Sequence, residues 1–112
     1  MRVFVVEPNH RYDLTQAKAY GEIVYLMPVP VHPSNTDWVV IGVREGAKRM
    51  AFDPLSDYVC MTGQATNVAI MLSVLHSQYG RTLKCLMFHP LTSTYQERII
   101  CLDAEAPIGA QT

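Results

Sequence analysis

The sequence predicts a small, Rossmann-like α/β domain of three layers, built on a mostly parallel sheet of about five strands. Two observations predict this fold. Short apolar or β-branched runs alternate with segments of helical character, which is the pattern of a parallel sheet covered by helices. The last two runs are separated only by a turn, so they predict an antiparallel hairpin at the C-terminal edge of the sheet.

The first strand is expected over the apolar run from Val3 to Val6, which is typical of a strand buried on both faces. Asp13 then provides an N-cap for a helix from Leu14 to Tyr20, and Gly21 follows at a position that favours positive φ. The second strand spans Glu22 to Met27 and is closed by prolines, which cannot donate to a ladder.

The segment from Thr36 to Met50 is compatible with two structures. A helix is indicated by apolar residues at helical spacing, namely Val39, Val43, Ala47 and Met50. A hairpin turning at Arg44 to Gly46 is the alternative, because the segment is rich in β-branched residues and holds two glycines, each of which weakens a helix by about 1 kcal/mol. We favour the helix, since the next strand is then reached by a crossover, as a parallel sheet requires.

The clearest unit begins with a strand from Asp57 to Thr62, which Gly63 breaks. Thr66 or Asn67 is expected to cap the helix that follows and runs through Tyr79.

Two more strands are expected, over Leu83 to Phe88 and Thr94 to Leu102, joined by a turn from Pro90 to Ser93. These elements place one domain over residues 1–102. The small, polar stretch from Asp103 to Thr112 is expected to be a flexible tail.

The composition narrows the classes of function. The chain of 112 residues has a net charge of -1 and a pI near 6.4, so charge gives no reason to expect double-stranded nucleic acid as a partner. No apolar run approaches the roughly 18 residues of a membrane span, and the apolar N-terminal run is too short for a signal peptide. A cytoplasmic location and no membrane partner are therefore expected.

The cysteines support the same compartment. Cys60, Cys85 and Cys101 are odd in number, lie in apolar runs and show no C-x-x-C spacing. These features favour reduced core thiols over a disulfide scaffold.

The helix from Val68 to Leu75 is apolar almost all the way round. In so small a domain one sheet does not cover all of that surface, and a helix of this kind is usually buried on a second side. We therefore expect a homodimer or a higher homo-oligomer.

The carboxyl edge of the parallel strands is where a ligand is expected, near the point where the strand order reverses. Gly63 lets a ligand approach the backbone closely, and the free N–H groups at the following helix start favour an anion. These features predict a binding site for a phosphate-bearing small molecule, formed by Arg11, Tyr12, Thr62, Gly63, Gln64, Thr66 and Asn67. The alternative interpretation is that Thr66 and Asn67 only cap the helix.

His10, His32 and His89 are expected at the same edge, where their titration near neutrality suits acid–base chemistry. No nucleophile or carboxylate pair accompanies them, so no catalytic residue is assigned and a non-enzymatic function is favoured. Neither a metal site nor a cofactor is expected from these spacings.

Several short stretches carry a resemblance, namely Tyr12 to Leu14, Tyr20 to Leu26, Phe52 to Pro54, Asp57 to Val59 and Tyr95 to Arg98. Together they resemble small α/β proteins of bacteriophages and other mobile elements, which implies a host-cytoplasmic location but no activity. At pattern level, the strand, Thr-Gly turn and helix are also similar to CRISPR-associated Rossmann-fold domains that bind cyclic oligonucleotides.

Three functional hypotheses follow. The first is a binding module for a phosphate-bearing ligand, such as a nucleotide second messenger, acting in sequestration or sensing. The second is a small phosphodiesterase-like enzyme that uses one of the three loop histidines on cyclic nucleotides. The third is a protein-interaction effector from a phage or mobile element.

Overall fold

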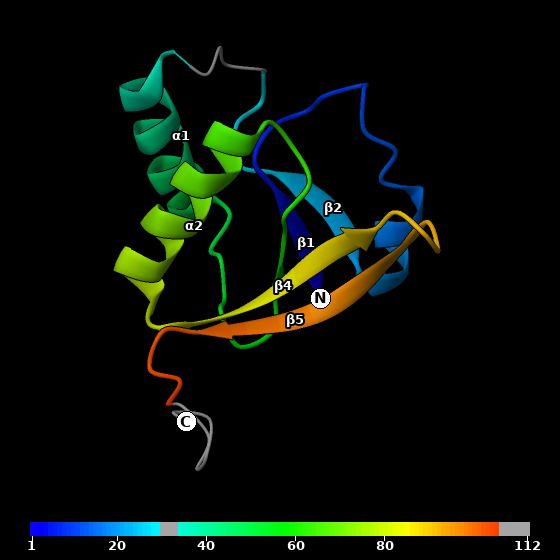
Figure 1. The fold of residues 1–112 in the computed structure, drawn as a ribbon. Helices are drawn as coiled ribbons and strands as arrows, with labels where there is room; N and C mark the ends of the chain where they lie inside the picture. Colours follow the sequence, from blue (N-terminus) through cyan, green and yellow to red (C-terminus); the bar gives the residue numbers. More distant parts are fainter. Residues whose placement is uncertain (30–33, 106–112) are drawn as a thin grey trace.

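The computed structural model describes residues 1–29 and 34–105, which form a five-stranded sheet of order β2-β1-β3-β4-β5 (Figure 1). The strands are β1 (Arg2–Val5), β2 (Glu22–Tyr25), β3 (Tyr58–Cys60), β4 (Thr82–His89) and β5 (Thr94–Cys101). The first four strands are parallel, and β4 pairs antiparallel with β5. The predicted α/β class, with its C-terminal antiparallel hairpin, is confirmed.

Helical segments cover both faces of the sheet. α1 (Thr36–Arg49) and α2 (Ala65–Tyr79) pack together on one face, and the 3-10 helix η1 (Thr15–Tyr20) lies on the other (Figure 1). The directions of the crossovers explain this division. The connection from β1 to β2 runs toward one edge of the sheet, whereas those from β2 to β3 and from β3 to β4 run toward the other edge. Because crossovers between parallel strands are right-handed, the two directions place their helical segments on opposite faces. Among the described helices, none has the length and apolar character needed to cross a bilayer.

β1 is buried on both faces, as its continuous apolar run predicts. Phe4 and Val6 belong to the core beneath α1 and α2, whereas Val3 and Val5 belong to the core beneath η1. The alternation of side chains along a strand therefore divides one apolar run between two cores.

The segment that was compatible with a helix or a hairpin is the helix α1. Val39, Val43 and Ala47 are fully buried on one stripe of it. Gly46 weakens the helix locally but is required by packing, because a Cβ atom there would collide with the carbonyl oxygen of Leu26. The glycine that argued against a helix in the sequence thus allows the close approach of α1 to the chain after β2.

Two predicted helix starts are wrong in detail. The segment after Asp13 forms a 3-10 helix, and Asp13 does not occupy the N-cap but accepts a hydrogen bond from the Thr15 amide over 2.9 Å. α2 is capped by Gln64 in place of Thr66 or Asn67, since the Gln64 side chain accepts from the Asn67 amide over 3.0 Å. In both cases the helix begins at a residue other than the one predicted, so a different side chain accepts the hydrogen bond beside its first turn.

Strand boundaries also differ from the predictions. β3 covers only three residues, while β4 and β5 extend over eight residues each. Within the stretch expected to be a tail, Asp103 pairs with Arg81 over 2.7 Å and the Ala104 amide donates to the Cys101 carbonyl. The last seven residues of the predicted tail, 106–112, lie outside the described part.

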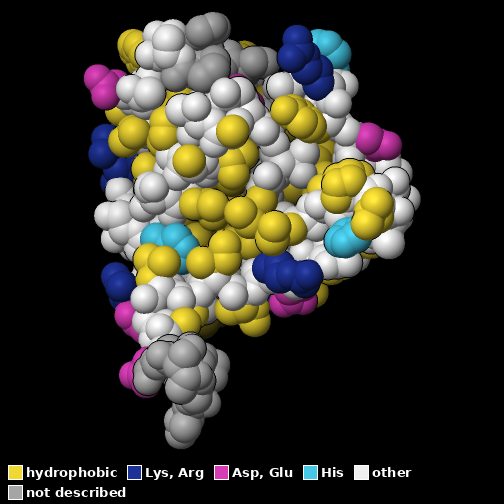
Figure 2. All heavy atoms as spheres, in the orientation of Figure 1, with side chains coloured by type: hydrophobic (Ala, Val, Ile, Leu, Met, Phe, Trp, Pro, Cys, Tyr) yellow, Lys and Arg dark blue, Asp and Glu magenta, His cyan; other side chains and the backbone are white. Residues whose placement is uncertain are grey.

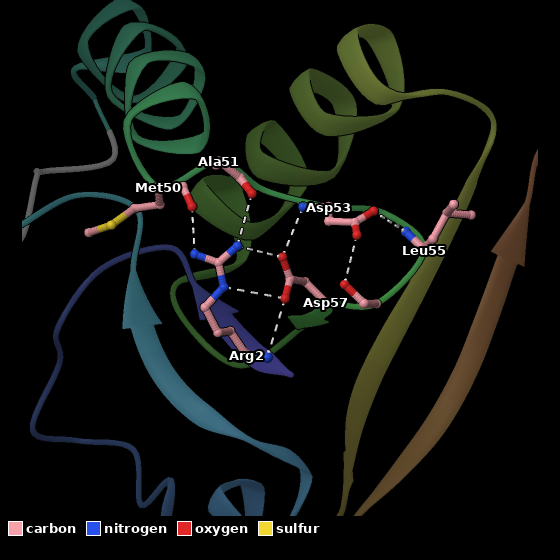
Figure 3. Close-up of polar contacts among 7 residues, drawn as sticks. Arg2, Met50, Ala51, Asp53, Leu55 and Asp57 are labelled. Atoms are coloured by element: carbon pink, nitrogen blue, oxygen red, sulfur yellow. Dashed lines mark hydrogen bonds and ion pairs between the residues drawn. The ribbon is translucent and has the colours of Figure 1, made fainter.

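An ion pair joins the amino ends of the two central strands (Figure 3). Arg2 Nη2 lies 2.9 Å from Asp57 Oδ2, and the Arg2 backbone amide donates to Asp57 Oδ1 over 3.2 Å. The guanidinium also donates to the carbonyls of Met50 and Ala51 in the chain that leads from α1 to β3. Because Asp57 also accepts from the Asp53 amide over 2.8 Å, its buried carboxylate is well satisfied.

We expect Asp57→Ala to lower the free energy of unfolding by about 2–4 kcal/mol, since it leaves the Arg2 guanidinium without its charged partner. The matched control is Asp103→Ala, which removes an exposed ion pair with Arg81 and is expected to cost less than about 0.5 kcal/mol. Urea unfolding of both variants measures the difference. Equal losses would contradict a structural role for the Arg2–Asp57 pair.

Candidate functional site

A hollow of about 550 Å³ lies at the carboxyl ends of the parallel strands. The strand order reverses between β1 and β3, so the chain segments that follow these two strands diverge and leave a space between them. The segment after β1 contributes Arg11, Tyr12, Asp13 and Gln16 to this hollow. The segment after β3 contributes Met61, Thr62 and Gly63, and the β4–β5 hairpin contributes Phe88, Ser93 and Tyr95.

The floor of the hollow is a buried tyrosine held at both ends. The Tyr95 hydroxyl lies 2.9 Å from Thr62 Oγ1, and its backbone carbonyl accepts from the Tyr20 hydroxyl over 2.9 Å. Phe88 packs edge-on against the Tyr95 ring with centroids 5.4 Å apart. Burial raises the pKa of the Tyr95 hydroxyl, so a neutral hydrogen-bonding group faces the hollow at physiological pH.

Gly63 shapes the wall that follows β3. Its φ of +153° is disfavoured for residues with a side chain, and a Cβ atom would lie 3.2 Å from side-chain atoms of both Val6 and Val68. The glycine therefore lets the chain turn from β3 into α2 in the narrow space between Val6 and Val68.

Within residues 1–29 and 34–105, the charges lining the hollow are one arginine and one aspartate, Arg11 and Asp13, both exposed. Hydrogen bonds from Thr15 and the nearby Lys18 lower the pKa of Asp13, so it stays ionised at neutral pH. The hollow is thus close to electrically neutral, with a single cation that can pair with an anionic group.

The predicted binding residues fall into two groups. Arg11, Tyr12, Thr62 and Gly63 come together as lining of the hollow. Gln64, Thr66 and Asn67 lie in the first turn of α2 or just before it and do not line it: Gln64 caps the helix, Thr66 is exposed and Asn67 is fully buried.

Glu7 is a buried residue beside the start of α2 whose role the sequence did not predict. It follows β1, is 5% exposed, and its carboxylate accepts a hydrogen bond from Asn67 Nδ2 over 2.7 Å. A carboxylate against the first turn of α2 already uses the favourable end of the helix dipole. The sequence signal that could have identified Glu7 is a charged residue directly after a buried apolar run.

Neither His10 nor His89 lines the hollow. His10 lies in a neighbouring depression beside β2, and His89 is half-buried with Nδ1 3.4 Å from the Thr92 hydroxyl. His32 lies outside the described residues. Within residues 1–29 and 34–105, no group of three or more His, Cys, Asp or Glu side chains is placed to hold a metal ion.

The hairpin side chains Phe88, Ser93 and Tyr95 were also missed by the sequence analysis. Phe88 and Tyr95 are direct cross-strand partners and so lie on the same face of the sheet, toward η1. Their position depends on the register of β4 with β5, which the sequence does not encode locally.

Comparison with known proteins identifies the family of the chain. The profile of the family described as Phage Pam3 gp32-like protein matches residues 1–101. The chain belongs to this family. The match confirms the predicted resemblance to bacteriophage proteins, whereas nothing supports the resemblance to CRISPR-associated domains. No curated protein and no solved structure matches the chain of this gp32-like family member.

The three cysteines differ in accessibility. Cys60 and Cys85 are buried and Cys101 is exposed, and all three are free thiols. Burial raises the pKa of Cys60 and raises that of Cys85 to about 11. A buried thiol with a raised pKa is slow to form the reactive thiolate.

We therefore expect a thiol reagent such as Ellman's reagent to label Cys101 rapidly in the folded protein, and all 3 cysteines only in urea. Rapid labelling of every cysteine in the native state would contradict the buried positions.

Because the raised pKa of Cys85 favours the protonated form, its contribution to stability is present below pH 9.0 and is lost as the pH rises toward about 11.

Proposed function

We propose that this protein is a binding module for a small molecule that carries an aromatic ring and a single phosphate, of the class of nucleoside monophosphates or cyclic mononucleotides. The observation that carries the proposal is the hollow at the strand-order reversal, which combines one arginine with aromatic side chains from two different segments. Its volume of about 550 Å³ lies within the range of small-molecule sites.

The aromatic side chains suit a planar base. Tyr12 and Phe88 are 38% and 44% exposed, and both line the hollow from separate segments of the chain. Exposed aromatic faces stack on nucleobases with little dependence on the identity of the base. The hydroxyls of Thr62 and Tyr95 offer hydrogen bonds to the polar edge of such a ring.

The charge balance favours one phosphate over a chain of phosphates. A guanidinium pairs with a phosphate through two parallel hydrogen bonds, and Arg11 is the single cation lining the hollow within the described residues. Asp13, which is ionised, suits a ribose hydroxyl but would repel further phosphates. A triphosphate would bring several negative charges to this one arginine.

The strand order also supports a nucleotide-type ligand. The order β2-β1-β3-β4-β5 is similar to that of flavodoxin-like doubly wound sheets, although β5 is antiparallel here. In such sheets ligands bind outside the carboxyl ends of the strands at the reversal point. This likeness between folds adds to the support that the residues lining the hollow give.

Binding is favoured over a phosphodiesterase-like activity. A general acid or base must lie within hydrogen-bond reach of the reacting group. Neither His10 nor His89 lines the hollow. Sequestration or sensing of a nucleotide, including a second messenger, is therefore the function that the described residues suit best.

A thermal-shift and calorimetric titration with AMP, GMP, CMP and the 3′,5′-cyclic mononucleotides tests the proposal. At least one compound is expected to bind, and Arg11→Ala is expected to weaken that binding by roughly 10–100-fold, because it removes a charged hydrogen-bond donor. The control Arg49→Ala alters an equally exposed arginine at the end of α1 and should leave binding unchanged. No binding by any of these compounds, or equal effects of both substitutions, would overturn the proposal.

A further inference from the structure

The two edges of the sheet are protected to different degrees. β2 forms one edge with only four residues, and the chain after it soon reaches prolines. β5 forms the other edge with eight residues that pair with β4 through eight consecutive positions without a bulge. A long, regular edge strand without lysine or proline is a template for pairing with another strand.

The outer edge of β5 presents backbone groups at alternate residues. The Leu102 amide donates to the Arg81 carbonyl over 2.8 Å, so the even-numbered residues of β5 bond inward to β4. The N–H and C=O groups of Glu97 and Ile99 therefore point away from the sheet. Among the described strands, none pairs with this edge.

Apolar side chains flank the same edge. Ile99 is 64% exposed, and beside the strand a groove of about 480 Å³ is lined by Leu72 of α2 together with Ile100 and Leu102. Figure 2 shows hydrophobic side chains gathered over the face where α2 meets the β4–β5 pair. α2 also packs against α1, and its half-buried Leu72 is the apolar residue of this helix that lines the groove beside β5.

We propose that β5 pairs antiparallel with β5 of a second copy of this chain, forming a two-fold dimer with a continuous sheet. A two-fold axis at Ile99 places Ile99 opposite its own copy in a hydrogen-bonded pair, since its amide and carbonyl both face outward. In this register Glu97 lies opposite Cys101 and Arg98 opposite Ile100, so no like charges face each other directly. An axis at Glu97 or at Arg98 would oppose two identical charges, which disfavours those registers.

This register leaves the hollow between Arg11 and Tyr95 outside the paired residues, so the dimer and the proposed ligand site are independent. It also gives the predicted homo-oligomer a defined surface, which combines the edge of β5 with the groove lined by Leu72, Ile100 and Leu102. An unrelated protein strand added to β5 is the competing occupant, and it predicts a monomer for the purified chain.

Light scattering coupled to size exclusion tests the dimer. The native protein is expected to be dimeric and Ile99→Lys monomeric, because the substitution sets two lysines opposite each other across the axis. Ile41→Lys, on the exposed side of α1, is the matched control and should remain dimeric. A monomeric native protein, a dimer that survives Ile99→Lys, or dissociation by both substitutions would overturn the proposal.

A second variant keeps the test decisive if Ile99→Lys fails to fold. Glu97→Cys places a thiol opposite the native Cys101 of the other copy, at a strand spacing that a disulfide can bridge. Under oxidising conditions this variant is expected to form a covalent dimer in high yield, whereas Lys18→Cys, on exposed η1, should not. Equal cross-linking of the two variants would contradict pairing through β5.

Discussion

The ion pair between Arg2 and Asp57 holds together the two strands on which the sheet is built. It lies at the amino ends of β1 and β3, and its guanidinium also binds two carbonyls of the chain that joins α1 to β3 (Figure 3). One of them belongs to Ala51, whose φ of +53° is a strained conformation for alanine, costing about 1–2 kcal/mol. A single arginine therefore fixes the pairing of the central strands and stabilises an unfavourable turn between α1 and β3.

The pairing of β1 and β3 at their amino ends also determines how the chain is arranged at their carboxyl ends. Since β1 and β3 are adjacent and parallel, the chain segments after them start side by side and then separate toward β2 and β4. The hydrogen bond from Asn67 to Glu7 closes the part of this opening that lies against α2. The part that lies toward η1 and the hairpin stays open, and it is there that Arg11, Thr62 and Tyr95 meet. The division between the closed side and the open side is thus made by buried polar contacts.

The sequence predicted the elements better than the contacts between them. The run from Val3 to Val6 predicted a strand buried on both faces, and the apolar stripe from Val39 to Ala47 predicted α1, because both patterns are local and periodic. The decisive polar contacts are not local. Arg2 and Asp57 are separated by 55 positions and Glu7 and Asn67 by 60, so no spacing rule brings them together. Gln64 and Asn67 were assigned to a ligand by the pattern, although the structure uses both to build the start of α2.

The difference between local patterns and non-local contacts also explains which residues of the hollow the sequence predicted. Arg11, Tyr12, Thr62 and Gly63 follow the first and third strands directly, so the rule that ligands lie beyond the carboxyl ends of strands was enough to find them. Phe88 and Tyr95 reach the hollow only because the hairpin of two eight-residue strands extends past the other parallel strands in one register. Strand length and register arise from packing of the whole sheet, which local sequence does not determine.

The central claim is that the ligand site is the hollow beside η1 and that the first turn of α2 is structural. An amide NMR titration of the native protein with a nucleoside monophosphate tests this most directly. We expect saturable shifts concentrated at Arg11 to Asp13, at Thr62 and Gly63, and at Phe88 to Tyr95. Shifts centred on Ala65 to Asn67, or no saturable shifts for any nucleotide tested, would contradict the account.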